Sequence, residues 1–160
     1  MKSIRLFLES TSPPHHLFIK ILNVYKKEYS WDLFHIKLKI TKYGRYNDGK
    51  ICYDMKPGEF GGSWTDKNII YLNQDMESVK KFYKVTTSIQ DLTTIIISHE
   101  LAHEVYRNIL NNIEKKTWVN RIKKTNFKST YLNHVSKKKY DEELFCEYIA
   151  HQILNKIKDY

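Results

Sequence analysis

Two histidines and a glutamate stand close together in this chain, in the order His99-Glu100-Leu101-Ala102-His103. On a helix, histidines four residues apart share one face, with Cβ atoms roughly 5–6 Å apart. Both rings can then reach one Zn²⁺ at about 2.0–2.1 Å, and the glutamate between them can take a proton from a water molecule at the metal. The composition gives roughly 0.02 chance matches to this pattern. It therefore indicates a zinc hydrolase, the alternative being a helix with two partly buried histidines.

Two histidines do not complete a catalytic zinc site, which usually has three protein ligands and a water molecule. The longer motif with a third histidine six residues after the second is absent, because that position holds Ile109. Glu104, Tyr106, Arg107 and Asn108 follow the motif closely, and none is well placed to turn back to the metal. We expect Glu104 to face solvent. The third ligand must come from another element.

The best candidate for the third ligand is Glu143, which opens a helical pattern 40 residues after His103. Alone, a glutamate in a first helical turn is explained by the helix dipole, so only its pairing with the histidine motif makes it a ligand. Glu147 lies one turn later on the same face. It could accept a hydrogen bond from the far nitrogen of a ligand histidine, or it could pair with a surface lysine.

Together these motifs resemble the gluzincin metallopeptidases, above all the small ImmA/IrrE-like branch. The match covers roughly residues 58–154, including a glycine-led stretch at 61–73 that is similar to the family's edge strand. The resemblance implies a zincin-like domain that holds Zn²⁺ through His99, His103 and Glu143 and hydrolyses peptide bonds with Glu100 as general base. A peptide substrate would pair with the edge strand in extended form.

The chain departs from the family pattern at Cys146, where alanine is usual, and at Glu147, where asparagine or aspartate is common. We interpret Cys146 as a small core residue. The chain also resembles the SprT-like proteases, which often carry the same five-residue motif but use a histidine as third ligand. His134 is the candidate for that role. His134, Tyr131 and Tyr140 are also candidate donors to the oxyanion of the tetrahedral intermediate.

Alternation of apolar and polar residues predicts the strands that accompany this site. We expect strands near residues 4–8, 34–40, 50–55 and 69–73, with a turn at residues 47–49 that makes 50–55 a partner of 34–40. Helical spacing predicts helices near 13–29 and 76–84 and from Asp141 to Ile157. The histidine helix should begin at a Thr87 or Ser88 cap and carry an apolar stripe as far as Ile113.

The expected fold class is therefore α+β. We expect a small, mostly antiparallel sheet, an active-site helix below its edge strand and a C-terminal ligand helix, in one domain over residues 1–160. No apolar run approaches the length of a membrane span, and the N-terminus turns polar too soon for a signal peptide. Cys52 and Cys146 lie far apart and suggest reduced thiols. These features predict a cytoplasmic protein, and the resemblance to the metallopeptidases implies that it acts on a protein or peptide.

The net charge of the chain is +9, and much of it is concentrated in residues 114–140, with nine Lys or Arg against one acid. Such a basic connecting stretch, with aromatic residues in it, could bind nucleic acid non-specifically. It could equally be a solvated surface that has no nucleic-acid partner. Two rival functions follow, a nucleic-acid-associated protease and a regulatory module in which the zinc fold only binds a partner.

Overall fold

The computed structural model describes residues 13–41, 45–47, 50–52, 61–64, 68–83 and 86–160, and the strand expected at residues 4–8 lies outside them. Within these ranges the structure is α+β, as the sequence predicted. Its elements are α2 (Pro13–Tyr29), β1 (Lys37–Thr41), β2 (Arg45–Asn47), β3 (Lys50–Cys52), β4 (Gly61–Trp64), β5 (Ile69–Asn73), α3 (Met76–Tyr83), α4 (Ile89–Glu104), η1 (Val105–Ile109), α5 (Asn112–Lys123), η2 (Thr130–His134), α6 (Tyr140–Lys156) and η3 (Ile157–Asp159).

A sheet of three strands has the order β1-β5-β4, with β5 at its centre. β1 and β5 run parallel, with Lys37 opposite Ile69, whereas β4 runs antiparallel to β5, with Gly61 opposite Leu72. The expectation of a mostly antiparallel sheet is therefore wrong for the longest pairing, and the sheet is mixed. Parallel neighbours need a long connection, and the chain between β1 and β5 provides one that contains β2, β3 and β4.

Two strand predictions are corrected by this topology. Residues 61–73 do not form one edge strand, because β4 alone occupies that edge and β5 is central. Residues 50–52 pair with β2, not with the strand near 34–40. The physical reason is the apolar run of β5, in which Ile70 to Asn73 are all buried. A strand that is buried on both faces is typical of a sheet interior, so β5 takes the place beside β1.

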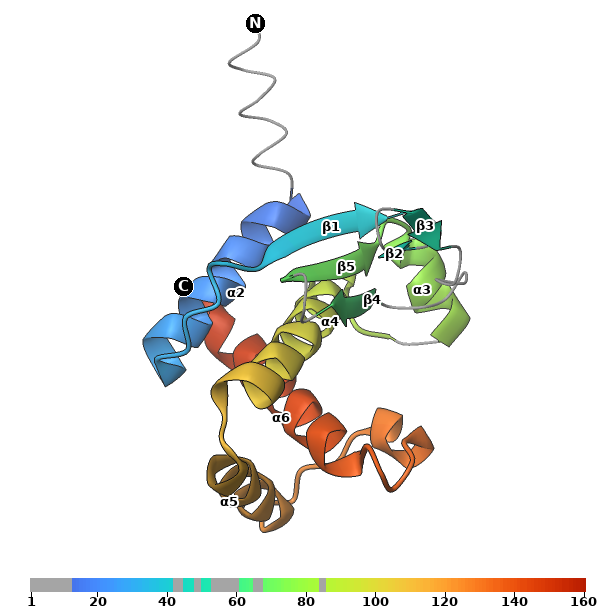
Figure 1. Ribbon diagram of the computed structural model, residues 1–160. Helices are drawn as coiled ribbons and strands as arrows, with labels where there is room; N and C mark the ends of the chain where they lie inside the picture. The colour runs from blue at the N-terminus through green and yellow to red at the C-terminus, as the bar shows by residue number, and fades with distance from the viewer. Residues whose placement is uncertain (1–12, 42–44, 48–49, 53–60, 65–67, 84–85) are drawn as a thin grey trace, which may run out of the picture.

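Helices α4 and α6 cross below the sheet, and α2 flanks them, as Figure 1 shows. α4 packs against β4, β5 and α6, and α5 packs against α6 at the end distant from the sheet. Ser88 caps α4 by accepting a hydrogen bond from the backbone of Asp91, as the sequence predicted. The Tyr25 hydroxyl of α2 donates a 2.6 Å hydrogen bond to the Ser98 carbonyl, which ties α2 to the helix that carries both histidines.

The histidine helix ends earlier than its apolar stripe suggested. After Glu104 the chain forms a π-helical turn, and Leu110 is extended, with φ −79° and ψ 134°. Asn111 then opens α5 with a capping box that it shares with Glu114. Ile113, expected on the inward stripe, is 78% exposed. The prediction fails because the local hydrogen bonds of the new cap start a second helix whose faces are turned relative to those of α4.

One hydrophobic core joins the sheet to the helices. Its fully buried members include Ile21 and Tyr25 of α2, Ile70 of β5, Leu101 of α4 and Phe145 of α6. This core fixes α4 against α6, the pair of helices that carries the candidate site.

Of the helices in the described ranges, none is both long enough and apolar enough to cross a bilayer.

Candidate metal centre

The C-terminal part of α4 places His99 and His103 side by side against α6. Their ring centroids are 5.0 Å apart, and the residues are only 9% and 6% exposed, respectively. Glu100, between them in sequence, is half-buried, and its carboxylate raises the pKa of both histidines through its charge. The motif read from the sequence is thus a compact group of three side chains on one helix.

Glu143, in the first turn of α6, meets both histidines at their outer nitrogens. Its Oε2 lies 2.9 Å from His99 Nε2, and its Oε1 lies 3.4 Å from His103 Nε2. Two imidazole nitrogens and a carboxylate that converge in this way are a donor set that zinc uses. The residues therefore fit a metal ion, and Glu143 lies where the sequence expected the third ligand.

The other ring nitrogen of each histidine faces a second carboxylate. His99 Nδ1 lies 2.8 Å from Glu147 Oε2, and His103 Nδ1 lies 2.5 Å from Glu142 Oε2. An ionised carboxylate only accepts hydrogen bonds, so each Nδ1 carries a hydrogen, and Nε2 offers a lone pair to a metal once that nitrogen has given up its own proton. This is the arrangement found around metal-ligating histidines. Glu147 accepts the hydrogen bond from a histidine nitrogen that the sequence suggested, whereas Glu142 was not among the predicted residues.

The electrostatics of the centre favour a positive charge between these carboxylates. Burial lowers the pKa of His99, but hydrogen bonds to Glu143 and Glu147 outweigh it and raise that pKa to about 10. In the same way, burial raises the pKa of Glu143, and its hydrogen bonds to His103 and His99 more than reverse the effect and hold it well below its usual range. A buried group of this kind stabilises a cation, either a proton on the rings or a metal ion.

Two further side chains hold these outer carboxylates. Arg107 donates from Nε and Nη2 to Glu142 Oε2 at 2.8 and 2.7 Å, and Ser129 Oγ donates to Glu147 Oε1 at 2.7 Å. Sequence reasoning passed over both residues. Arg107 could have been found from its position four residues after His103, which puts it on the same helical face. Ser129 lies in an irregular segment and gave no signal.

The three candidate oxyanion donors fall in different places. The Tyr131 hydroxyl donates to Glu143 Oε2 at 3.2 Å, and its ring stands edge-on to His99 at 5.5 Å. Burial and the Glu143 charge raise the pKa of this hydroxyl, so it keeps its proton. His134 is exposed at the end of η2, and Tyr140 begins α6 half-buried. None of the described contacts joins His134 or Tyr140 to the histidines of the centre.

Cys146 lies closer to the histidines than its expected role as a core residue implied. Its sulfur and one ring nitrogen from each of His99 and His103 all lie within 4.8 Å of one another. The thiol is fully buried, and burial raises its pKa. Of the two candidate third ligands, Glu143 contacts Nε2 of both rings, whereas the raised pKa of the Cys146 thiol opposes the thiolate that a metal requires.

Glu104 does not face solvent as expected, because it is only 1% exposed. Its Oε2 accepts a hydrogen bond from Asn108 at 2.9 Å, and its Oε1 has no partner among the described residues. The reason is the central position of α4, which is buried on all sides over residues 101–105. On a surface helix this position would be exposed to solvent, but on α4 it is enclosed by the surrounding elements.

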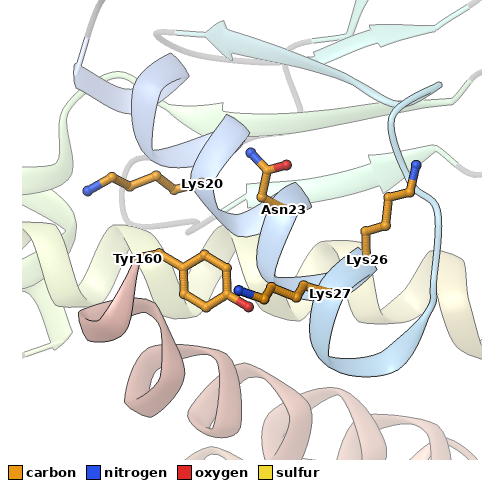
Figure 2. Close-up of a pocket in the computed structure, with 5 residues that line it drawn as sticks. All are labelled: Lys20, Asn23, Lys26, Lys27 and Tyr160. Atoms are coloured by element: carbon orange, nitrogen blue, oxygen red, sulfur yellow. The ribbon is translucent and has the colours of Figure 1, made fainter.

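A surface hollow between α2 and the C-terminus is separate from this centre. It is lined by Lys20, Asn23, Lys26, Lys27 and Tyr160 (Figure 2). Neither histidine lines it; Lys27 points toward Tyr160, and Lys20 and Lys26 extend to opposite sides of the hollow (Figure 2).

Comparison of the chain with protein-family models, curated proteins and solved structures finds no match. The evidence for function is therefore the chemistry of the side chains.

Proposed function

We propose that this protein is a zinc-dependent metallopeptidase with a zincin-like domain of the gluzincin type. The observation that carries the proposal is the arrangement of four carboxylate contacts around two histidines. Both Nε2 atoms face Glu143, whereas Nδ1 of His99 faces Glu147 and Nδ1 of His103 faces Glu142. Two buried histidines in an ordinary helix pair would not need matched carboxylates at all four ring nitrogens.

Each residue of the centre then has a definite task. His99, His103 and Glu143 would hold Zn²⁺, which supplies Lewis-acid chemistry when bound by polarising the scissile carbonyl and acidifying a water molecule. Glu100 takes a proton from the attacking water and passes it to the leaving amine. Tyr131 keeps its proton and lies beside Glu143, so it is the best placed of the three candidates to donate to the oxyanion.

The topology supports the same proposal. β4 is the edge of the sheet and packs against α4, the helix of both histidines. An extended peptide can add to an exposed sheet edge through backbone hydrogen bonds. A peptide bound along β4 would lie over the helix that carries Glu100.

The test combines metal analysis with two variants. We expect about one Zn²⁺ per chain in protein purified without chelator. Glu100→Gln should keep the metal but lose hydrolysis of casein, since an amide cannot take the proton. His103→Ala should lose the metal. Glu77→Gln, which changes an exposed acid on α3, is the matched control and should keep both.

Two results would contradict the proposal. Zinc content well below one that added zinc does not restore would exclude the metal centre. Bound zinc without hydrolysis of any protein substrate would favour a regulatory module that only binds a partner.

A further inference from the structure

The segment between α5 and α6, residues 124–139, lies against the candidate metal centre and is rich in lysine. We call it the lysine segment. Its Ser129 contacts Glu147 at 2.7 Å, and its Tyr131 contacts Glu143 at 3.2 Å. Residues adjacent in sequence to these two are therefore held at the border of the site. In Figure 1 the segment is the orange chain that leads into α6.

Apolar side chains anchor the lysine segment on α6. Phe127 packs edge-on against the rings of Tyr148 and His151, with centroids 5.4 and 5.3 Å away. Leu132 is buried in the core, and Val135 packs against it. The backbone of the segment is thus fixed relative to Glu143 and Glu147, and its charged side chains start from fixed positions.

The lysines of this segment have no acidic partner within the described residues. From residue 115 to residue 140 the chain contains no acidic residue. None of the segment's lysines forms an ion pair with any part of the chain that the structure describes, and all are exposed; they are Lys124, Lys128, Lys137, Lys138 and Lys139. Lysines elsewhere do find partners, as Lys123 does with Asp141 at 3.2 Å.

The carboxylates of the metal centre do not neutralise these lysines. Glu142 is engaged by His103 and Arg107, Glu143 by both histidines, and Glu147 by His99 and Ser129. Exposed like charges held at one border of a site attract ligands of opposite sign and hasten their binding. The unpaired ammonium groups are therefore available to a bound molecule.

We propose that the lysine segment selects acidic substrates, so that the peptidase binds protein segments rich in Asp and Glu near the cleaved bond. This inference rests on the proposed function and names its substrate class.

We favour a peptide over a nucleic acid as the ligand of the lysine segment, because single-stranded nucleic acids bind by stacking their bases on exposed aromatic rings. In the lysine segment Phe127 packs inward, and the half-exposed Tyr131 is already bonded to Glu143.

The experiment measures binding to the full-length Glu100→Gln protein loaded with zinc, so that the probe is not cleaved. The probe is a fluorescein-labelled glutamate-rich peptide, compared with a glutamine-rich peptide of the same length and with single-stranded oligothymidine. We expect the acidic peptide to bind roughly tenfold more tightly than the neutral one. The preference should weaken as salt is raised from about 0.05 to 0.2 M.

Lysine variants locate the effect. Lys128→Gln combined with Lys137→Gln and Lys138→Gln should remove most of the preference for the acidic peptide. The matched control replaces Lys20, Lys26 and Lys27 by glutamine. These three lysines also line one hollow (Figure 2), but they belong to α2 and not to the lysine segment. That control makes the same change in net charge and should keep the preference.

Three outcomes would overturn the inference: equal binding of both peptides, equal losses in both triple variants, or tighter binding of oligothymidine than of the acidic peptide. The last would move the lysine segment to nucleic-acid binding. Zinc content and casein hydrolysis of the unmodified protein are measured in parallel. Failure of the proposed function would appear there, whereas failure of this inference appears only in the peptide and lysine comparisons.

Discussion

At the scale of single residues, the centre is organised by carboxylates that each bind more than one partner. Glu142 Oε2 accepts from His103 Nδ1 and from two nitrogens of Arg107. One carboxylate oxygen therefore links a surface guanidinium to the orientation of a buried imidazole. Such outer hydrogen bonds set the tautomer and direction of a metal-ligating ring, and losing them typically costs 10–100-fold in metal affinity.

The first prediction concerns this link. Glu142→Gln should lower zinc affinity by roughly 10–100-fold, and Arg107→Gln by a smaller factor, because Arg107 acts on His103 only through Glu142. Adding Arg107→Gln to Glu142→Gln should then have almost no further effect, which a double-mutant cycle detects. The measurement is competition with a zinc chelator. Independent, additive losses would show that Arg107 does not work through this carboxylate.

The second prediction separates the two candidate third ligands. Glu143→Ala should abolish tight zinc binding, because Glu143 contacts Nε2 of both histidines. His134→Ala should leave zinc affinity unchanged, since His134 is exposed at the end of η2. The opposite result in a zinc titration of both variants would favour the SprT-like reading and, with it, a nucleic-acid partner.

The sequence predicted the residues of the candidate site that belong to a strong periodic pattern. Helices with clear apolar stripes carry five of them, so the face on which each lies could be predicted; they are His99, Glu100, His103, Glu143 and Glu147. Of their outer partners, Arg107 follows His103 by four residues and could have been found from that spacing, whereas Ser129 lies in an irregular segment and could not. No spacing rule describes where such backbone directs a side chain.

At the scale of elements, the packing of α4 against α6 assembles the candidate centre. The existence and approximate limits of α2 and α6, and the start of α4, followed from their sequence patterns. The end of α4 did not, since the apolar stripe continues in sequence through Ile109 and Ile113, which are 40% and 78% exposed. Local capping at Asn111 outweighed the apolar pattern. Strand pairing was also beyond periodicity, which predicts strands but not their neighbours.

The third prediction tests the cap that begins α5. Asn111 accepts a hydrogen bond from the Glu114 backbone at 2.8 Å, and the Glu114 side chain accepts one from the Asn111 backbone at 3.0 Å. Asn111→Ala should cost about 0.5–2 kcal/mol of unfolding free energy, with zinc affinity unchanged. Asn112→Ala, one residue inside the helix, is the control and should be neutral or slightly stabilising. Equal losses in urea unfolding of the two variants would mean that the cap contributes nothing.

At the scale of the whole molecule, the core and the candidate metal centre share α4 and α6 but are stabilised by different interactions. The core joins residues from α2, the sheet, α4 and α6 without any contribution from the centre. In the candidate centre, Glu142, Glu143 and Glu147 face the two histidines, and either protons on the rings or a bound metal ion can offset the repulsion between these carboxylates. We therefore expect the fold to persist without metal and to gain stability when a metal binds.

The fourth prediction follows from this division. A ligand that binds only the folded state stabilises it by RT ln(1 + [L]/Kd), which is about 2.7 kcal/mol at a hundredfold excess over Kd. Chelator treatment should therefore lower Tm while the far-ultraviolet circular dichroism stays that of a folded α+β protein, and added zinc should restore Tm in a concentration-dependent way. His103→Ala should show no zinc-dependent rise, because it lacks one ligand of the centre. If removal of zinc instead unfolded the chain completely, the metal would be required for folding. It could then not have a purely catalytic role.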